Sequence, residues 1–188
     1  LAARVFPGAR TLDRDNAQAN FYALCRLANE YRSGDRYLSG NGDEDVRAFV
    51  MAAVKHSGVD LQWASAPLKK DREIVLAAVT GDGYALRYAD EAFLKDPAIV
   101  LVAVTQYGNA LRYASDDLKK DREIVLAAVT RNGQVLYYAD EDLKKDREIV
   151  LAAVNQDGHA LEDASVLLKV DRAFIMSAVT QNGYALRY

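Results

Sequence analysis

The chain has 188 residues, of which 51% are hydrophobic and 27% are charged, and its formal net charge is -3 at pH 7. This is the composition of a folded protein, and no apolar run reaches the length of a membrane-spanning helix. Acidic and basic residues alternate along the chain, so a basic face for a polyanion is not expected. Cys25 is the only cysteine, which excludes an intrachain disulfide and favours an intracellular reducing compartment.

The N-terminal segment, residues 1–45, stands outside the pattern that follows it. It opens without an initiator Met and without the apolar core of a signal peptide, so we expect the chain to be part of a longer protein or of a larger assembly. Residues 11–33 carry apolar side chains at helical spacing and are predicted to form a capping helix. The glycine-rich, polar stretch 33–45 predicts a linker.

A 25-residue period runs through residues 46–188. Each period contains a glycine, with a valine four residues before it and a leucine three residues after it. Residues 68–90 and 118–140 differ at only 5 of 23 positions. We therefore divide this part of the chain into six units, 46–70, 71–95, 96–120, 121–145, 146–170 and 171–188, the last of which is partial. The glycines of the period are Gly58, Gly83, Gly108, Gly133, Gly158 and Gly183.

Local chemistry predicts two helices in each unit. In the second unit, Asp71 suits an N-cap and Glu73 adds negative charge to the first helical turn. The apolar run 74–79 then forms the longer helix, and Gly83 is predicted to end it in the left-handed conformation. A shorter helix fits residues 84–89. A buried strand is the alternative for so short an apolar run, but the paired alanines, the aspartate and the glycine favour a helix.

These helices cannot be stable alone, because a helix of about ten residues is marginal in water. Each unit must bury its apolar face against its neighbours, as the units of repeat proteins do. We therefore predict an all-α fold, an α-solenoid of six 25-residue repeats with one longer and one short helix each. The N-terminal helix would cover the first open face.

The units resemble a family of tandem helical repeats of unknown function that is common in multi-repeat proteins of algae and other protists. Its unit is similar to LKxDREIVLAAVxxNGxALxYAS, and "DREIVLAAV" stands here at Asp71, Asp121 and Asp146. The resemblance covers 46–188 and implies an α-helical repeat with no established activity or cofactor. The first unit departs most, with Asp60 at an alanine position, and in the fifth unit Asp163 replaces a tyrosine.

Catalytic chemistry finds little support in the residues. The two histidines, His56 and His159, lie at variable positions of their units and are interpreted as surface substitutions. No phosphate loop or metal-ligand motif is present, and the spacing of carboxylates such as Asp116 and Asp117 does not follow a calcium loop. Cys25 lies on an apolar stripe, which favours a small buried hydrophobe over a nucleophile. We therefore expect no enzyme activity, no metal and no cofactor.

Nucleic acid is the first alternative ligand, because variation concentrates in the two residues before each glycine, and repeats that read one base each are physically sensible. No lysine follows the glycine to contact a phosphate. A chain with an acidic net charge also lacks the affinity that basic proteins gain when they release counterions from nucleic acid. We do not expect nucleic acid to be the partner.

A protein-binding or scaffolding role fits variable polar residues on a fixed scaffold. The alternative is a structural accessory subunit of a large assembly, such as an organellar one. Tyr88, Tyr113 and Tyr138 are expected to pack between units, whereas tyrosines outside that series suit an interface. The predicted partner-binding residues, for protein partners of unknown identity, are Asp82, Tyr84, Arg87, Tyr107, Asn109, Arg112, Arg131, Gln134, Tyr137 and His159.

Overall fold

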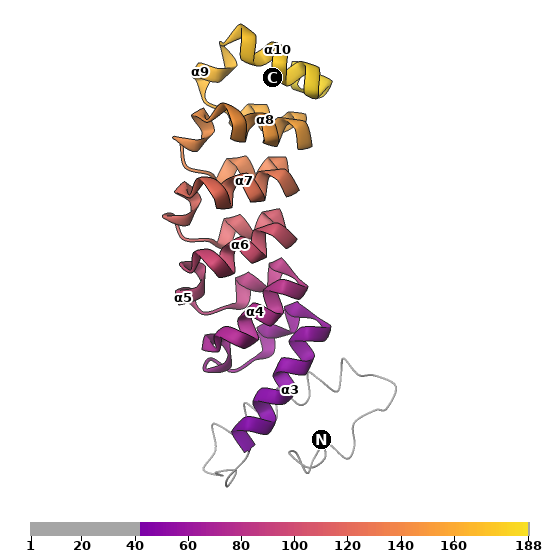
Figure 1. The fold of residues 1–188 in the computed structure, drawn as a ribbon, viewed down its shortest axis with the longest axis vertical. Coiled ribbons are helices and arrows are strands. Elements are labelled where there is room, and N and C mark those ends of the chain that lie inside the picture. Colours follow the sequence, from indigo (N-terminus) through magenta and orange to yellow (C-terminus); the bar gives the residue numbers. More distant parts are fainter. Residues whose placement is uncertain (1–41, 188) are drawn as a thin grey trace.

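The computed structural model describes residues 42–187, with side chains from Arg47 onward. Within this range the chain is helical and contains no strand. Tandem units stack along one axis, from α3 at one end to α10 at the other (Figure 1). The expected all-helical class with tandem repeated units is confirmed, whereas the predicted capping helix at 11–33 lies outside the described residues.

The long helices run side by side across the stack, and neighbours along the chain pack against each other. They begin directly after an aspartate in every unit except the first. The first unit has Val46 at that position, and its helix begins at Gly42, four residues before the expected start of the array. The long helices are α3 (Gly42–His56), α4 (Arg72–Gly81), α6 (Pro97–Gln106), α7 (Arg122–Arg131), α8 (Arg147–Gln156) and α10 (Arg172–Gln181).

The second helix of each unit is a 3₁₀ helix rather than an α-helix. It starts at the glycine of the period and packs against the long helix of the same unit. These helices are η2 (Gly58–Trp63), η4 (Gly83–Tyr88), η5 (Gly108–Tyr113), η7 (Gly133–Tyr138), η9 (Gly158–Asp163) and η10 (Gly183–Arg187).

A third, one-turn helix follows the second helix in the first five units, so the prediction of two helices per unit was wrong. Bonds of the i to i+3 type close it, for example from the Asp71 amide to the Leu68 carbonyl at 3.1 Å. The third helices line one edge of the array (Figure 1). They are η3 (Leu68–Lys70), α5 (Glu91–Leu94), η6 (Leu118–Lys120), η8 (Leu143–Lys145) and α9 (Val166–Lys169).

The aspartate caps form as predicted. The Asp71 carboxylate accepts from the Glu73 and Ile74 amides at 2.9 and 3.3 Å, which satisfies donors that a helix start leaves free. The third unit has Pro97 at the first helical position, where the missing N–H costs nothing. Asp96 caps that helix through the Ala98 and Ile99 amides.

The role predicted for the glycines was wrong. None of the six has a left-handed φ. The long helix ends instead in an extended residue such as Asp82 (φ -150°), whose carboxylate accepts from the Tyr84 amide at 2.9 Å and starts the 3₁₀ helix. Glycine is needed because the next unit approaches too closely: a Cβ on Gly108 would lie 2.6 Å from the Ala128 carbonyl oxygen.

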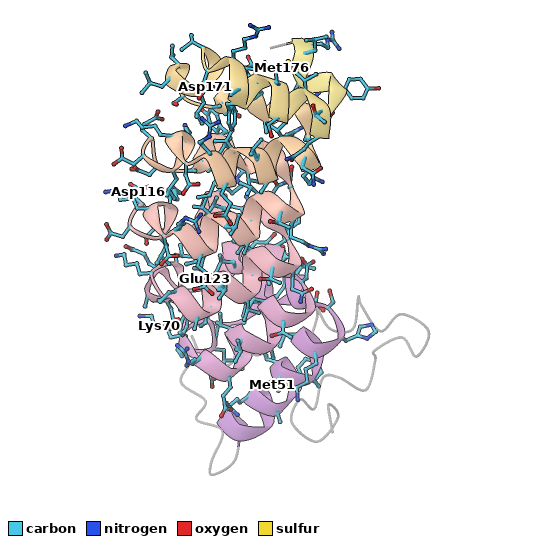
Figure 2. All side chains as sticks on the ribbon, turned by 45° about the horizontal axis from the view of Figure 1, so that its top comes forward. Met51, Lys70, Asp116, Glu123, Asp171 and Met176 are labelled. Atoms are coloured by element: carbon cyan, nitrogen blue, oxygen red, sulfur yellow. The ribbon has the colours of Figure 1, made fainter. Side chains whose placement is uncertain are left out.

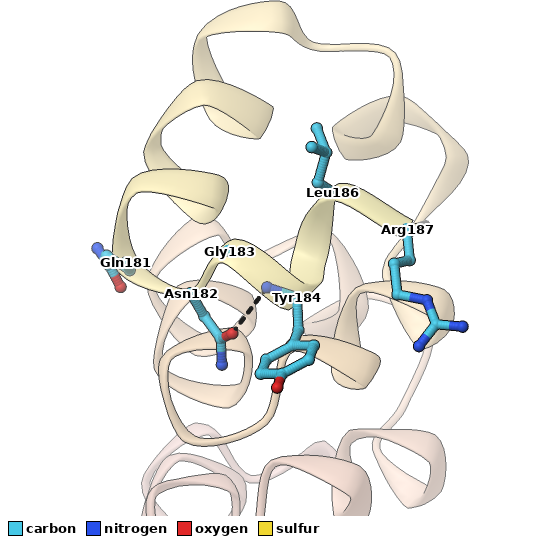
Figure 3. Close-up of a pocket in the computed structure, with 6 residues that line it drawn as sticks. All are labelled: Gln181, Asn182, Gly183, Tyr184, Leu186 and Arg187. Atoms are coloured by element: carbon cyan, nitrogen blue, oxygen red, sulfur yellow. Dashed lines mark hydrogen bonds between the residues drawn. The ribbon is translucent and has the colours of Figure 1, made fainter.

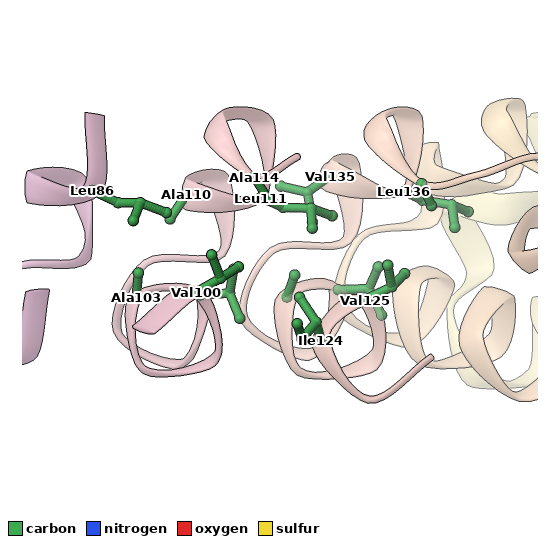
Figure 4. Packing of buried hydrophobic residues seen from close by; sticks show 14 of the residues in the cluster. Leu86, Val100, Ala103, Ala110, Leu111, Ala114, Ile124, Val125, Val135 and Leu136 are labelled. Atoms are coloured by element: carbon green, nitrogen blue, oxygen red, sulfur yellow. The ribbon is translucent and has the colours of Figure 1, made fainter. Parts of the chain in front are cut away.

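The core is a continuous column of small and branched apolar side chains between the two layers of helices. Leu86, Leu111 and Leu136 follow one another along the second helices, and Val100 and Val125 do so along the long helices (Figure 4). All five side chains are fully buried. This burial is the main stabilising contribution, because each unit removes the apolar face of the unit before it from water.

The last unit carries the same leucine without a neighbour to cover it. Leu186 is 75% exposed, whereas its equivalents Leu61, Leu86, Leu111, Leu136 and Leu161 are all fully buried. A Cβ on Gly183 would meet nothing within 4 Å. Leu186 and Gly183 can therefore serve as controls for substitutions at the equivalent leucines and glycines inside the array.

We predict that Leu111→Ala lowers the free energy of unfolding by about 2–5 kcal/mol, because it opens a cavity inside the column. Leu186→Ala should change it by less than about 0.5 kcal/mol, since that side chain is already in water. Urea denaturation of both variants measures the difference. Equal losses from the two substitutions would contradict the stacking described above.

We predict that Gly133→Ala destabilises the protein by about 1–3 kcal/mol, the usual cost of forcing extra volume into a packed interior. The new methyl group would overlap the Ala153 carbonyl of the following unit. Gly183→Ala is the control, because it adds the same group where nothing lies near. Thermal unfolding of the two variants should separate a loss caused by close approach from one caused by backbone strain, which would affect both.

One buried carboxyl group breaks the apolar column. Asp60 is 5% exposed, and its Oδ1 atom has no hydrogen-bond partner. Its equivalents in the later units, residues 85, 110, 135, 160 and 185, are alanine or valine. Burial raises the pKa of Asp60, although the nearby His56 opposes this shift.

We predict that Asp60→Ala stabilises the protein by about 1–3 kcal/mol at pH 7, because an unsatisfied buried polar group is removed. The folded-state pKa of this acid lies above its unfolded value of 3.8, so its unfavourable contribution develops as the pH rises through the two values. The gain should therefore be smaller at pH 4 than at pH 7. Denaturant unfolding at both pH values measures it, with Asp60→Asn as the uncharged control of similar shape.

Candidate functional site

The clearest concentration of predicted site residues lies where the second and third units meet. Tyr84 is its centre: its ring makes edge-to-face contacts with Tyr88, Tyr107 and Tyr113 at centroid distances of 5.8, 6.0 and 6.0 Å. Two arginines of the second helices, η4 and η5, border the rings. We call this group the Tyr–Arg cluster; it consists of Tyr84, Arg87, Tyr88, Tyr107, Arg112 and Tyr113.

The arginines place positive charge beside the aromatic faces. The Arg87 guanidinium lies 5.8 Å from the ring centroids of both Tyr84 and Tyr88, and Arg112 lies 5.2 Å from that of Tyr113. Such cation–π contacts are worth about 0.5–1 kcal/mol at exposed sites. Both guanidinium groups remain exposed. The contacts therefore hold the arginines in place without covering them.

The hydroxyl groups of the cluster differ in their electrostatic surroundings. Arg87 donates to the Tyr84 hydroxyl, and this hydrogen bond lowers the pKa of Tyr84. Burial raises the pKa of Tyr88 and of Tyr113. Tyr88 and Tyr113 are half-buried and pack against the core, as expected from the sequence. Tyr84 lies between them and the exposed Tyr107.

Tyr107 occupies the turn position that is aspartate or asparagine in the second, fourth, fifth and sixth units. It makes no side-chain cap, so the third unit gives up the bond that Asp82 makes to the Tyr84 amide. Its hydroxyl group instead accepts from the Asn109 side chain at 3.1 Å. The third unit thus exchanges a structural cap for an exposed aromatic ring.

Three other predicted residues, Asn109, Arg131 and Gln134, make hydrogen bonds between successive units. Asn109 accepts from the Asn132 side chain at 2.6 Å, and Gln134 donates to Asp157 at 2.8 Å. Arg131 donates to the Gln106 carbonyl at 3.3 Å. Because these groups already bond between units, they contribute to the stack as well as to its surface.

Two predicted residues stand apart from the Tyr–Arg cluster. Tyr137 is 64% exposed, makes an edge-to-face contact with Tyr138 at 5.2 Å and lies beneath the Lys144 ammonium group. His159 is exposed and its Nδ1 atom lies 2.9 Å from the Asp157 carboxylate. The structure therefore brings together Tyr84, Arg87, Tyr107 and Arg112, with Asn109 beside them, and leaves Tyr137 and His159 at later units.

An open hollow of about 540 Å³ lies at the C-terminal end of the array (Figure 3). Its lining consists of residues 181–184, Leu186 and Arg187, and the Asn182 side chain accepts from the Tyr184 amide at 3.1 Å. No carboxylate, imidazole or thiol group lines it. In interior units the next long helix packs on the equivalent residues. The hollow is therefore explained by the absence of such a helix after the last unit in this structure.

A metal site is not formed by the part of the chain that the structure describes, since no group of three or more His, Cys, Asp or Glu side chains there could hold an ion. Among the same residues, no helix is long and apolar enough to cross a bilayer.

Sequence reasoning missed a group of exposed apolar side chains on the third helix of the fifth unit. Val166, Leu167 and Val170 are 73%, 71% and 73% exposed. The equivalent positions in the three preceding units carry Glu, Asp, Lys and a single Ala. The signal for this group is visible when the units are aligned, because apolar residues replace charged ones at all three positions only in the fifth unit among the second to fifth.

Comparison with family models agrees with the repeat. A model described as "Domain of unknown function (DUF4116)" matches residues 47–94, 96–144 and 146–188, and each match spans about two of the 25-residue units. Curated proteins and solved structures gave no match. Because the three matches together cover well over half of the sequence, the chain belongs to this family of tandem repeats of unknown function.

Proposed function

We propose that the protein is a non-catalytic protein-binding or scaffolding module, an α-solenoid of six 25-residue repeats with an N-terminal capping helix. The Tyr–Arg cluster is the observation that carries this proposal. It joins rigid aromatic rings and exposed guanidinium groups across two units. Tyrosine and arginine are enriched among residues that dominate binding energy at protein interfaces.

The chemistry of the cluster suits a peptide segment that offers a carboxylate and an apolar or aromatic side chain. Arg87 and Arg112 can each meet a carboxylate through a planar pair of donors. Tyr107, which makes no cap within its own unit, offers an exposed ring and hydroxyl. Since the rings are held by one another, little side-chain entropy is lost when a partner binds.

The positions themselves support a binding role. The third unit loses a cap hydrogen bond at Tyr107, a substitution that costs about 1 kcal/mol in typical helices. A residue that gives up a structural bond for an exposed aromatic ring is better explained by recognition than by folding. The buried positions of the same unit keep the residue types of the period.

The sequence provides a matched control for testing the site. "GYALRY" occurs at 83–88, inside the Tyr–Arg cluster, and again at 183–188. We predict that Arg87→Ala together with Arg112→Ala weakens partner binding by about 30-fold or more, the effect of losing an interface hot spot. Arg187→Ala should leave binding unchanged. Affinity capture followed by titration of the recovered partner measures both.

The folded state must be unchanged for this comparison to hold, and circular dichroism with thermal unfolding checks it. The lost cation–π contacts are worth about 0.5–1 kcal/mol each, so we expect an unchanged helical signal and a fall in melting temperature of about 2–4 °C for each kcal/mol lost. Equal binding by the double variant and the native protein would refute the assignment of the cluster as the binding site.

A structural accessory subunit is the second candidate, favoured by the apolar surface that Val166, Leu167 and Val170 leave exposed. Native mass spectrometry of the protein purified from its source separates the two roles. A partner that binds reversibly supports the module, whereas fixed stoichiometric partners in every preparation support the subunit. A salt-sensitive shift of a mixed oligonucleotide pool would instead favour nucleic acid.

A further inference from the structure

The third helices form a continuous edge of the array, which we call the third-helix edge. One backbone hydrogen bond joins each of the first four to the next unit, for example from the Ser115 amide to the Leu94 carbonyl at 2.9 Å and from the Ser165 amide to the Lys144 carbonyl at 3.0 Å. Lys70 and Asp116 both project from this edge (Figure 2). The bonds keep the edge in register from unit to unit.

Two columns of opposite charge run along this edge. In the second, third and fourth units the third helix begins at or directly after exposed acidic residues and ends at or directly before an exposed lysine. Both ends lie on the same outward surface, because Lys95 pairs with Glu91 at 2.6 Å and Lys145 with Asp142 at 2.7 Å. The acidic column consists of Glu91, Asp116, Asp117, Glu141 and Asp142, and the basic column of Lys70, Lys95, Lys120 and Lys145.

Both columns end at the fifth unit, where the charged positions become Val166, Leu167 and Val170. This change is not required for folding, because the same positions are charged and exposed in the preceding units. It is also not explained by stacking. In the second, third and fourth units these positions stay exposed although a following unit is stacked beside them, so a further unit would not cover the three apolar side chains.

We propose that the third-helix edge pairs with the same edge of a second copy of this chain, as a two-fold dimer with the two arrays side by side and parallel. A rotation by 180° about an axis that is parallel to the array and lies between the two copies exchanges the two columns. It therefore places the acidic column of one copy opposite the basic column of its partner, unit by unit. The same rotation brings the apolar group of one fifth unit onto the other.

Self-complementarity of this kind is what a two-fold interface requires, because one surface must serve both sides. An edge of a single charge would repel its copy, and the apolar group, which lies at one end of the edge, meets itself only in the parallel arrangement. The ion pairs within each helix are exposed and contribute little, about 0–1 kcal/mol each, so they can exchange for partners across the interface. The apolar group supplies a desolvated contact at one end of the interface, and the columns supply charged contacts along the rest of it.

The inference is independent of the proposed binding site, since the Tyr–Arg cluster lies on other helices, η4 and η5, and at the turn before η5. Analytical ultracentrifugation of the full chain between about 1 and 200 µM tests it, because a dimer of ordinary affinity dissociates across such a range. We expect a concentration-dependent dimer. A chain that stays monomeric throughout this range overturns the proposal.

The fourth unit supplies the variant that tests the surface. Val166→Glu, Leu167→Asp and Val170→Lys together give the fifth unit the residues found at 141, 142 and 145, which fold in the same exposed positions. This triple variant should weaken the dimer by about 100-fold or more with no loss of thermal stability. Leu186→Glu is the control, because it changes an equally exposed apolar residue away from the edge and should leave the dimer intact. A triple variant that dimerises like the native chain would place the interface elsewhere.

Charge exchange tests the pairing of the columns. In one variant Lys95, Lys120 and Lys145 become glutamate, and in a second Glu91, Asp117 and Asp142 become lysine. Each alone should be mainly monomeric, because like charges would face each other, and an equimolar mixture should give the heterodimer by native mass spectrometry. Homodimers of either variant at the native level would contradict the arrangement.

Discussion

Close approach between successive units is the constraint on which the structure depends. At Gly58, Gly83, Gly108 and Gly133, the carbonyl oxygen of an alanine in the next long helix stands where a Cβ would be. Small residues are therefore needed on both sides of these four interfaces, glycine on one side and alanine on the other. This spacing lets the fully buried leucines and valines of adjacent units touch, which is how helices of ten residues gain stability that they lack alone.

The 25-residue period was readable from the sequence because packing repeats it. Each interior unit faces the same neighbour on both sides, so the buried positions and the cap aspartates recur, and the all-helical class with its helix starts was predicted correctly. The glycine could not be interpreted in the same way. A left-handed cap and a close backbone contact both demand glycine, and only the arrangement of the next unit distinguishes them. The 3₁₀ character of the second helix and the third one-turn helix depend on the same packing.

The candidate site was predictable only in part, for a related physical reason. Variability near the glycine pointed to Tyr84 and Tyr107, and the structure places their rings 6.0 Å apart. The same reasoning selected Asp82, which caps the following helix, and Gln134, which bonds to Asp157 in the next unit. Variable residues at this turn therefore serve two purposes, since polar side chains can vary while still pairing across the interface. Sequence variation alone cannot separate a residue that binds its neighbour from one that faces solvent.

A residue that departs from the repeat is more informative about function than a position that varies in every unit. Such a residue can be compared with the equivalent residues of the other five units, whose packing is seen in the structure. Asp60 replaces alanine inside the column and leaves a carboxyl oxygen unpaired, which weakens the first unit. In other units an arginine at the first helical position pairs with the cap aspartate of the next unit, as Arg122 does with Asp146 at 2.9 Å. The third unit has Pro97 at this position, so Asp121 lacks the arginine of the preceding unit. Val166, Leu167 and Val170 replace charges without any gain in core burial. A substitution in the core or in a pair changes stability, whereas an apolar substitution at an exposed position costs solubility and gives the fold nothing in return. That difference is why the third-helix edge, rather than the interior, is where an intermolecular contact is to be sought.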